Sequence, residues 1–185
     1  KWKIQTQPPM RLIILIICVT YITTGYAQDI SSWTKLGTAN WSTAKGVVQA
    51  DSSAGFLVSP SSYSDFKLTL EFWVSDEANS GVFIRCSDPN TITQANSYEV
   101  NIFDKRPDQK YRTGGIVDIA EPLAMINAGG KWNTYEIIAK GNHLTVKLNK
   151  ITTVDVDNSK FASGPIALQA SGGVVKFRKV KIKTM

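Results

Sequence analysis

The sequence predicts an all-β sandwich or barrel, and three observations predict it. Apolar and polar residues alternate along most of its hydrophobic segments, which is typical of strands with one buried face. Clusters of Gly, Pro, Ser, Asn and Asp separate these segments at short intervals. After residue 27, no segment shows the helical period of 3.6 residues. The length of 185 residues, 43% of them hydrophobic, favours one domain with one core.

The first element along the chain is predicted to be a secretory signal peptide. Arg11 precedes the apolar run 12–20, and Gly25 and Ala27 are the small residues that a signal peptidase reads. The run is shorter than the roughly 20 residues of a membrane span. We therefore expect residues 1–27 to hold upstream residues and a signal cleaved near Ala27, followed by one domain over 28–185. The expected location is secreted or periplasmic.

The strands of this domain are predicted from alternation, and their turns from Gly, Pro and Asn. Turn signals stand at 59–62, 76–80, 141–142 and 172–173, and Asn149-Lys150 predicts a tight hairpin because Asn tolerates the left-handed region. The predicted strands are 46–50, 55–59, 65–75, 80–87, 97–104, 133–140, 143–149, 151–155, 164–169 and 174–183.

The three segments between residues 65 and 104 place charges on their polar faces. Glu71, Arg85 and Glu99 each stand on one of these successive segments. Short connections favour antiparallel neighbours, which would set the two glutamates roughly 10 Å apart at the backbone with the arginine between them. The sequence thus predicts one charged cluster that acts on a ligand, or else a triplet that satisfies itself on a solvated face.

Charge and cysteine usage exclude several classes of protein. Without Lys1, Lys3 and Arg11, the excess of 6 basic residues falls to 3, and no Lys/Arg run is dense enough for a nucleic-acid interface. The basic segment 178–183 is predicted to be a solvated edge strand whose lysines discourage aggregation. Only Cys86 remains after processing, so we expect no internal disulfide and a core role for this residue.

Metal and nucleophile motifs are not found in the sequence. It contains no Cys/His zinc pattern, phosphate loop or nucleophile elbow. Asp155 and Asp157 lack a full set of calcium ligands, and His143 alternates with polar residues as an exposed side chain would. No metal-ligating residues are therefore assigned.

The longest irregular stretch is 104–131, directly after the segment that holds Glu99. Long loops in compact domains often carry function, although this one could equally cover one end of the sandwich. If it lines a site, its polar side chains are candidate substrate-binding groups, and Trp73, on the same face as Glu71, could stack on the ring of a ligand. The candidates for substrate binding are Trp73, Asn101, Asp104, Arg106, Tyr111 and Thr113.

Segments spread over nearly all of the chain after residue 27 together resemble the 3-keto-disaccharide hydrolase domain family. They are DFKLTLEF, NSGVFIR, SYEVNIFD, YRTGGIV, GKWNTYEI, GNHLTVKLN, GPIALQ and VVKFRKVKI, in the family's order. The resemblance implies a concanavalin-like jelly-roll β-sandwich of two antiparallel sheets, with a sugar groove on one of them. It also implies an exported bacterial protein of sugar metabolism.

Single positions match the family's motifs, with some departures. Glu71 stands at its acidic position, Arg85 at the arginine of NSGVF-x-R, and Glu99 in its YE pair. Asn101 stands where many members have Gln, and Thr113 matches the TG of the loop. The departures are Ser171 where many members have His, Val117 where they have Tyr, and Lys150 where they have Gly.

The resemblance implies cleavage of 3-keto-disaccharides or 3-keto-glycosides. The ketone acidifies the neighbouring C2–H, so Glu99 or Glu71 would act as base and the other would hold the substrate, while Arg85 and Asn101 stabilise the enolate. A divalent metal held by the carboxylates is an alternative to these donors. Because Ser171 replaces the family's histidine, a non-catalytic carbohydrate-binding, lectin-like module is the alternative function. In both cases the expected partner is an oligosaccharide or glycoside.

Overall fold

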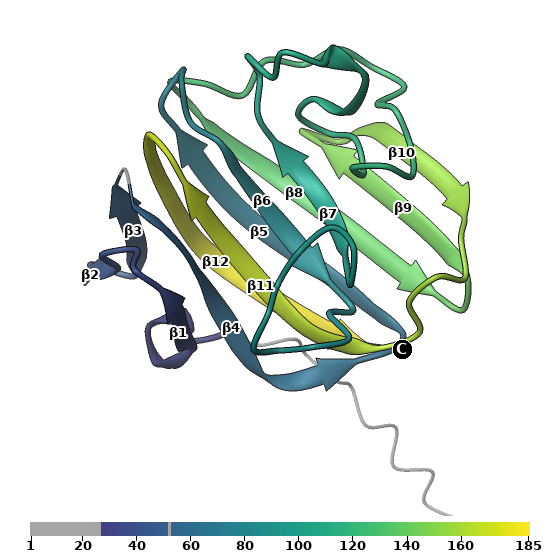
Figure 1. The fold of residues 1–185 in the computed structure, drawn as a ribbon, viewed down its shortest axis with the longest axis horizontal. Helices are drawn as coiled ribbons and strands as arrows, with labels where there is room; N and C mark the ends of the chain where they lie inside the picture. Colours follow the sequence, from purple (N-terminus) through teal and green to yellow (C-terminus); the bar gives the residue numbers. More distant parts are fainter. Residues whose placement is uncertain (1–26, 52) are drawn as a thin grey trace, which may run out of the picture.

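Two antiparallel sheets make up the molecule and pack face to face around one core (Figure 1). The computed structural model describes residues 27–51 and 53–185, so apart from Ala27 the predicted signal peptide lies outside the described residues. The prediction of an all-β sandwich of two antiparallel sheets is confirmed. In the described part of the chain, no helix has the length and apolar character needed to cross a membrane.

The smaller sheet has five strands in the order β1-β4-β11-β6-β7. Segments that are far apart in the sequence pair in this sheet, since β11 pairs with β4 on one side and with β6 on the other. The strands are β1 (Thr34–Gly37), β4 (Ala54–Tyr63), β6 (Ser80–Ile84), β7 (Tyr98–Ile102) and β11 (Gly164–Ser171).

The larger sheet has seven strands in the order β10-β9-β8-β5-β12-β3-β2. Its bounds are β2 (Ser42–Ala44), β3 (Val47–Asp51), β5 (Phe66–Val74), β8 (Trp132–Lys140), β9 (His143–Leu148), β10 (Ile151–Asp157) and β12 (Val174–Thr184). Two short 3₁₀ helices, η1 (Ile30–Ser32) and η2 (Gln109–Tyr111), complete the regular elements.

Alternating side chains from both sheets fill the core. On β5, every second residue from Phe66 to Val74 is buried and the residues between them are partly exposed. On β7, Val100 belongs to the core, which directs its neighbours Glu99 and Asn101 to the outer face of the five-stranded sheet. The same alternation directs Glu71 to the outer face of the seven-stranded sheet.

One local prediction was wrong, and another holds for part of its segment. The turn expected at 59–62 is part of β4, because the Ser59 hydroxyl accepts from Ile166 N at 2.9 Å across a register shift and keeps the strand attached. In the segment 178–183, Arg178 pairs with strands on both sides, since β3 pairs with residues 174–178 of β12. Beyond Arg178, β5 is the one strand neighbour of this segment among the described residues, and its other side meets Ala27 in an isolated bridge to Lys181.

The two tight turns of the β8–β9–β10 meander follow the prediction. Asn149 and Lys150 both have positive φ, of 51° and 71°, between the paired residues Leu148 and Ile151. Such a pair of left-handed residues matches the twist of a two-residue hairpin. Gly141 and Asn142 join the paired residues Lys140 and His143 in the same meander.

His143 lies between two carboxylates of β10. Its Nε2 is 2.7 Å from Asp155 Oδ1, and its Nδ1 is 2.8 Å from Asp157 Oδ1. Both ring nitrogens can donate only when the ring is protonated. The hydrogen bond that His143 donates to Asp157 and the negative charges of both aspartates therefore raise the pKa of His143. The contact therefore stabilises the fold fully at a pH below the pKa of the unfolded histidine. This stabilisation is lost as pH rises through the raised pKa of the folded state.

We expect Asp157→Asn to lower the pKa of His143, and NMR titration of its ring protons measures this. The chain contains one histidine, so the signal needs no assignment. Asp51→Asn, on the exposed end of β3, is the matched control and should leave the titration unchanged. An equal pKa in both variants would contradict the paired geometry.

Candidate functional site

The candidate site lies on the outer face of the five-stranded sheet. Core residues alternate with outward ones on β6, β7 and β11, so Phe83, Glu99 and Gln169 all point away from the core. Phe83 pairs with Glu99 on one side and with Ala167 on the other. This places a carboxyl group beside an apolar surface.

Aromatic and aliphatic side chains form that apolar surface. Phe56 and Phe83 meet edge to face with ring centroids 5.3 Å apart, over the small side chain of Ala167. Ile92, from the connection between β6 and β7, packs on the same cluster. Figure 1 shows this connection crossing in front of β11. It shields the aromatic pair, and Phe83 is fully buried.

Glu99 is a buried carboxyl group with an altered acidity. Only 8% of the residue is exposed, and no hydrogen bond or ion pair to its carboxylate occurs within 27–51 and 53–185. Burial raises the pKa of Glu99 to about 7; the Arg106 cation opposes this rise and the Asp118 anion adds to it. A carboxyl poised near neutral pH is suited to proton transfer.

Gly81 lets the Glu99 side chain lie close to the sheet. A Cβ at Gly81 would stand 3.3 Å from Glu99 Oε1 and 3.3 Å from the Phe83 ring. Because Leu168 pairs with Val82, and Gly81 with Asn101, the row across β11, β6 and β7 reads Gln169, Gly81 and Asn101. The Glu99 carboxyl leans over the middle of this row.

Polar atoms around Glu99 have no partner among the described residues. Gln169 Oε1, Asn101 Oδ1 and Arg106 Nε are buried and make no hydrogen bond there. A buried polar atom left unsatisfied is unfavourable by about 1–3 kcal/mol. Such atoms are typical of sites that complete their hydrogen bonds with a ligand or water.

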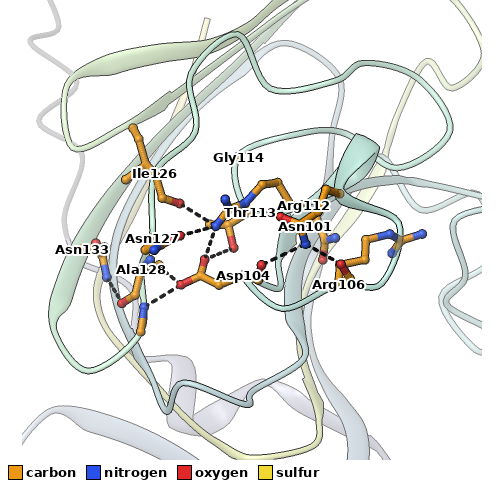
Figure 2. A network of polar contacts seen from close by, with 12 residues as sticks. Asn101, Asp104, Arg106, Arg112, Thr113, Gly114, Ile126, Asn127, Ala128 and Asn133 are labelled. Carbon is orange, nitrogen blue, oxygen red and sulfur yellow. Dashed lines mark hydrogen bonds and ion pairs between the residues drawn. The ribbon is translucent and has the colours of Figure 1, made fainter.

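Asp104 organises the loop beyond β7 (Figure 2). Its carboxylate accepts from Thr113 Oγ1 at 2.6 Å and from the backbone N–H groups of Ala128 and Gly129 at 2.7 and 2.9 Å, and it pairs with Arg112 at 3.5 Å. These contacts occupy both carboxylate oxygens. Asp104 and Thr113, predicted as substrate-binding residues, are instead held in the fold of the loop.

The other predicted substrate-binding residues of this region differ in what they contact. Asn101 Nδ2 donates to the carbonyl of Tyr111 at 2.5 Å, which ties β7 to the loop. Residues 114–117 continue this attachment, since Val117 N donates to the carbonyl of Glu99 and Ile116 forms an antiparallel bridge with Val100 of β7. Figure 2 shows the Arg106 side chain pointing away from the Asp104 network. Of this set, Arg106 is the one whose charge reaches Glu99.

The structure does not bring Arg85 to Glu99. Arg85 directly follows the last residue of β6, has φ 52° and is 1% exposed. Its guanidinium donates to the carbonyls of Ser64 (2.6 Å from Nη2), Gly141 and Phe161, and pairs with Asp65 at 3.3 Å. The arginine predicted to stabilise an enolate therefore has its nitrogens engaged in joining four segments of the fold.

Glu71 and Trp73 lie on the opposite outer face of the sandwich. β6 and β7 are antiparallel neighbours as predicted, but the prediction that β5 lies beside β6 was wrong. β5 belongs to the seven-stranded sheet, whereas β6 and β7 belong to the other. Glu71 pairs with Arg178 at 2.7 Å and Lys179 at 2.8 Å. The hydrogen bonds from these cations lower the pKa of Glu71, mainly that from Lys179, so it stays ionised. The thickness of the sandwich separates it from Glu99.

Sequence reasoning assigned no role to Gln169. Its signal was the LQ of the segment GPIALQ, which by alternation places Gln169 and Ser171 on one face of β11. Cys86, predicted as core, is buried. Burial raises the pKa of its thiol to about 12, which leaves it protonated at neutral pH.

Solved structures share this sandwich. A Parabacteroides distasonis ATCC 8503 protein, provisionally assigned as a glycosyl hydrolase, matches with a TM-score of 0.68 and 24% identity over 83% of this chain and 99% of its own. A second such protein from that organism has a TM-score of 0.72 and 16% identity, over 86% of this chain and 91% of its own.

The carbohydrate-binding module CBM66 of Bacillus subtilis matches with a TM-score of 0.66 and 19% identity, over 86% of this chain and 97% of its own. At these identities the structural likenesses show the fold. A search of curated proteins finds no significant match.

The family model is the more specific finding. The model described as a 3-keto-alpha-glucoside-1,2-lyase-like domain matches residues 26–183, which is nearly all of the chain that the structure describes. The match covers both sheets and the loop that Asp104 organises. It agrees with the motifs that first suggested this relationship, and the chain belongs to the family of 3-keto-alpha-glucoside-1,2-lyase-like domains.

Proposed function

We propose that this protein cleaves 3-keto-disaccharides or 3-keto-glycosides on the outer face of the five-stranded sheet, with Glu99 as the base. The observation that carries the proposal is the isolated, buried Glu99 carboxyl, whose pKa is raised to about 7. Membership of the family supports the substrate class.

The reaction follows from the acidity that a ketone confers. Glu99 removes the proton on C2, the electron pair forms the enolate of the C3 ketone, and the C1–O bond then breaks to release the second sugar or aglycone. The leaving oxygen takes a proton, and water adds to the resulting enone. Arg106, whose charge acts on Glu99, is the cation available to stabilise the enolate oxygen.

The residues around Glu99 do not fit a divalent metal. Glu71 cannot share an ion with Glu99, because the two stand on opposite faces of the sandwich. Among the described residues, no group of three His, Cys, Asp or Glu side chains could hold a metal. The proposed reaction therefore includes no metal ion.

A carbohydrate-binding module is the second candidate. Ser171 stands on the face of Glu99 and Gln169, at the position where many family members have His, and Ser provides no proton acceptor near neutral pH. The similarity to CBM66 agrees with this function. In that case the polar atoms of Gln169, Asn101 and Arg106 would bind an unmodified sugar.

The deciding experiment compares 3-keto-trehalose with trehalose. We expect the purified protein to release sugar from 3-keto-trehalose but not from trehalose. A chelator should not change this result. Deuterium at C2 should be lost to solvent during turnover, because elimination breaks that bond. Saturable binding of either sugar without release would contradict the proposal and favour the binding module.

Export is part of the same proposal. The charged, apolar and small-residue pattern of residues 11–27 supports a signal peptide. Expression of residues 1–185 should give a mature protein that begins near Gln28 outside the cytoplasm, as mass spectrometry of cell fractions would measure. An uncleaved cytoplasmic product would contradict it.

A further inference from the structure

The outer face of the seven-stranded sheet carries two neighbouring tryptophans. Trp73 of β5 and Trp132 of β8 are directly paired across the strands, and Trp132 is 36% exposed. Trp73 also pairs with Lys176 of β12 on its other side. None of these residues contributes to the Glu99 site, which lies on the other face of the sandwich.

Basic side chains lie over both indole rings. Lys176 Nζ is 4.6 Å from the centroid of the Trp73 ring, and the Arg178 guanidinium is 3.8 Å from that of Trp132. Lys45 reaches the same place from the turn between β2 and β3. We refer to Trp73, Trp132, Lys45, Lys176 and Arg178 as the cation–tryptophan platform.

The platform borders a depression of about 340 Å³. Ser42, Gln49 and Trp132 line it together with Lys45 and Lys176. Its polar groups include a hydroxyl and an amide, which donate hydrogen bonds to sugar hydroxyls. The lining therefore combines an aromatic surface, neutral donors and cations.

The cations of the platform lack matching carboxylates. Lys45 and Lys176 form no ion pair among residues 27–51 and 53–185, and only Nε of Arg178 contacts Glu71, which Lys179 shares. The outward residues of β5, β8 and β12 comprise two acidic residues and seven basic ones: Glu71, Glu136, Lys67, Lys140, Lys176, Arg178, Lys179, Lys181 and Lys183.

Charge is thus distributed unequally over the molecule. These three strands have an excess of five positive charges, whereas residues 28–185 as a whole have an excess of three, so the remainder is net negative. Lys176 and Arg178 stand where β12 pairs with both β3 and β5, so protection of a sheet edge does not explain these two cations. A concentrated basic face attracts polyanions.

We propose that the cation–tryptophan platform binds an acidic glycan, a chain of sugars that bear carboxylate or sulfate groups. The anionic groups contact Lys45, Lys176 and the free nitrogens of Arg178, and the sugar ring lies against the exposed part of Trp132. This site would hold the protein on an acidic polysaccharide while the opposite face remains free. The inference does not depend on cleavage of a 3-keto sugar.

Binding should be measured by calorimetry with oligogalacturonides and with their methyl esters, which are matched in size but uncharged. Sulfated chondroitin oligosaccharides and their unsulfated forms distinguish sulfate from carboxylate. We expect the acidic oligosaccharides to bind and the esters not to bind, with weaker affinity at higher salt. Equal binding of acid and ester would overturn the proposal.

The double variant Lys45→Gln/Lys176→Gln should weaken binding by about tenfold or more. Lys140→Gln/Lys160→Gln removes the same charge from the far end of β8 and from the β10–β11 connection, and should bind as the unchanged protein does. Equal losses in both variants would show attraction by net charge alone and contradict a site. The proposal would also be contradicted if the protein bound anionic vesicles or single-stranded DNA but did not bind acidic oligosaccharides.

Glu99→Gln separates the two proposals. It should abolish cleavage and leave acidic-glycan binding unchanged, because the carboxyl lies on the opposite outer face. If the protein proves inactive toward keto sugars, binding at the platform still tests this inference. If Glu99→Gln lost glycan binding, the acidic glycan would bind on the face of Glu99 instead of the cation–tryptophan platform, and this inference would be overturned.

Discussion

Glu99→Gln should reduce kcat for a 3-keto-glucoside by about 10²- to 10⁴-fold, the usual contribution of a positioned base. Gln keeps the size and shape of the side chain over Gly81 but cannot accept a proton. Glu71→Gln is the matched control, since it makes the same chemical change on the opposite sheet. We expect it to retain activity; equal losses in the two variants would contradict the assignment of Glu99.

The pH profile gives a second measure of the same residue. A base must be ionised, so kcat/KM should rise with pH and level off above about 7, the pKa to which burial raises Glu99. A profile that levels near 4.5, the ordinary glutamate value, would show a solvated carboxyl instead.

Stability should change in the opposite direction to activity. The folded pKa lies above the unfolded one, so the folded state binds the proton more tightly and stability falls as pH rises from about 4.5 through about 7. Because Gln is never ionised, Glu99→Gln should be more stable than the unchanged protein at pH 8, by up to about 3 kcal/mol. Thermal melts at pH 5 and pH 8 measure this and show that the variant is folded.

Arg85→Met should lower the free energy of unfolding by about 3–5 kcal/mol, the range for breaking a buried charged contact. Met fills a similar volume but leaves the carbonyls of Ser64, Gly141 and Phe161 without their donor. For a domain of this size, the melting temperature should fall by about 10 °C. Denaturant and thermal unfolding measure both quantities.

The control for Arg85 is Arg178→Met, which breaks a partly exposed pair with Glu71. Such pairs contribute about 0–1 kcal/mol, so stability should hardly change. If Arg85→Met melted like the unchanged protein yet lost activity, Arg85 would have a direct role in the reaction. That result would restore the catalytic role predicted from the family motif.

Local patterns were sufficient to find most strands, because side-chain alternation is visible in the sequence. β5, for example, was predicted over 65–75 and spans Phe66–Val74. The short strands β1 and β2 were missed, since all residues of β2 are exposed and no apolar residue marks a buried face. Which strands pair was not predictable in the same way. The chain passes from one sheet to the other between β5 and β6, and nothing between residues 75 and 79 distinguishes that crossing from a hairpin.

The candidate site was predictable only in part, for the same reason. Alternation correctly placed Glu99 and Asn101 on an outer face, since these positions depend on β7 alone. The expected partners Glu71 and Arg85 were wrong for this face, because the partnership depended on strand pairing and on the left-handed backbone of Arg85. Gln169 reaches this face through β11, which lies far away in the sequence, whereas Gly81 comes from β6, the neighbour of β7.

The interior position of β12 has a consequence for how the chain folds. β12 is the last of the described strands, yet it pairs with two much earlier ones, with β3 through residues 174–178 and with β5 through residues 175–184. During synthesis, the first strands of the larger sheet therefore remain without their shared neighbour until β12 has been made. Pairings of such large sequence separation form slowly. The larger sheet is accordingly expected to complete its pairing only after β12 has been synthesised.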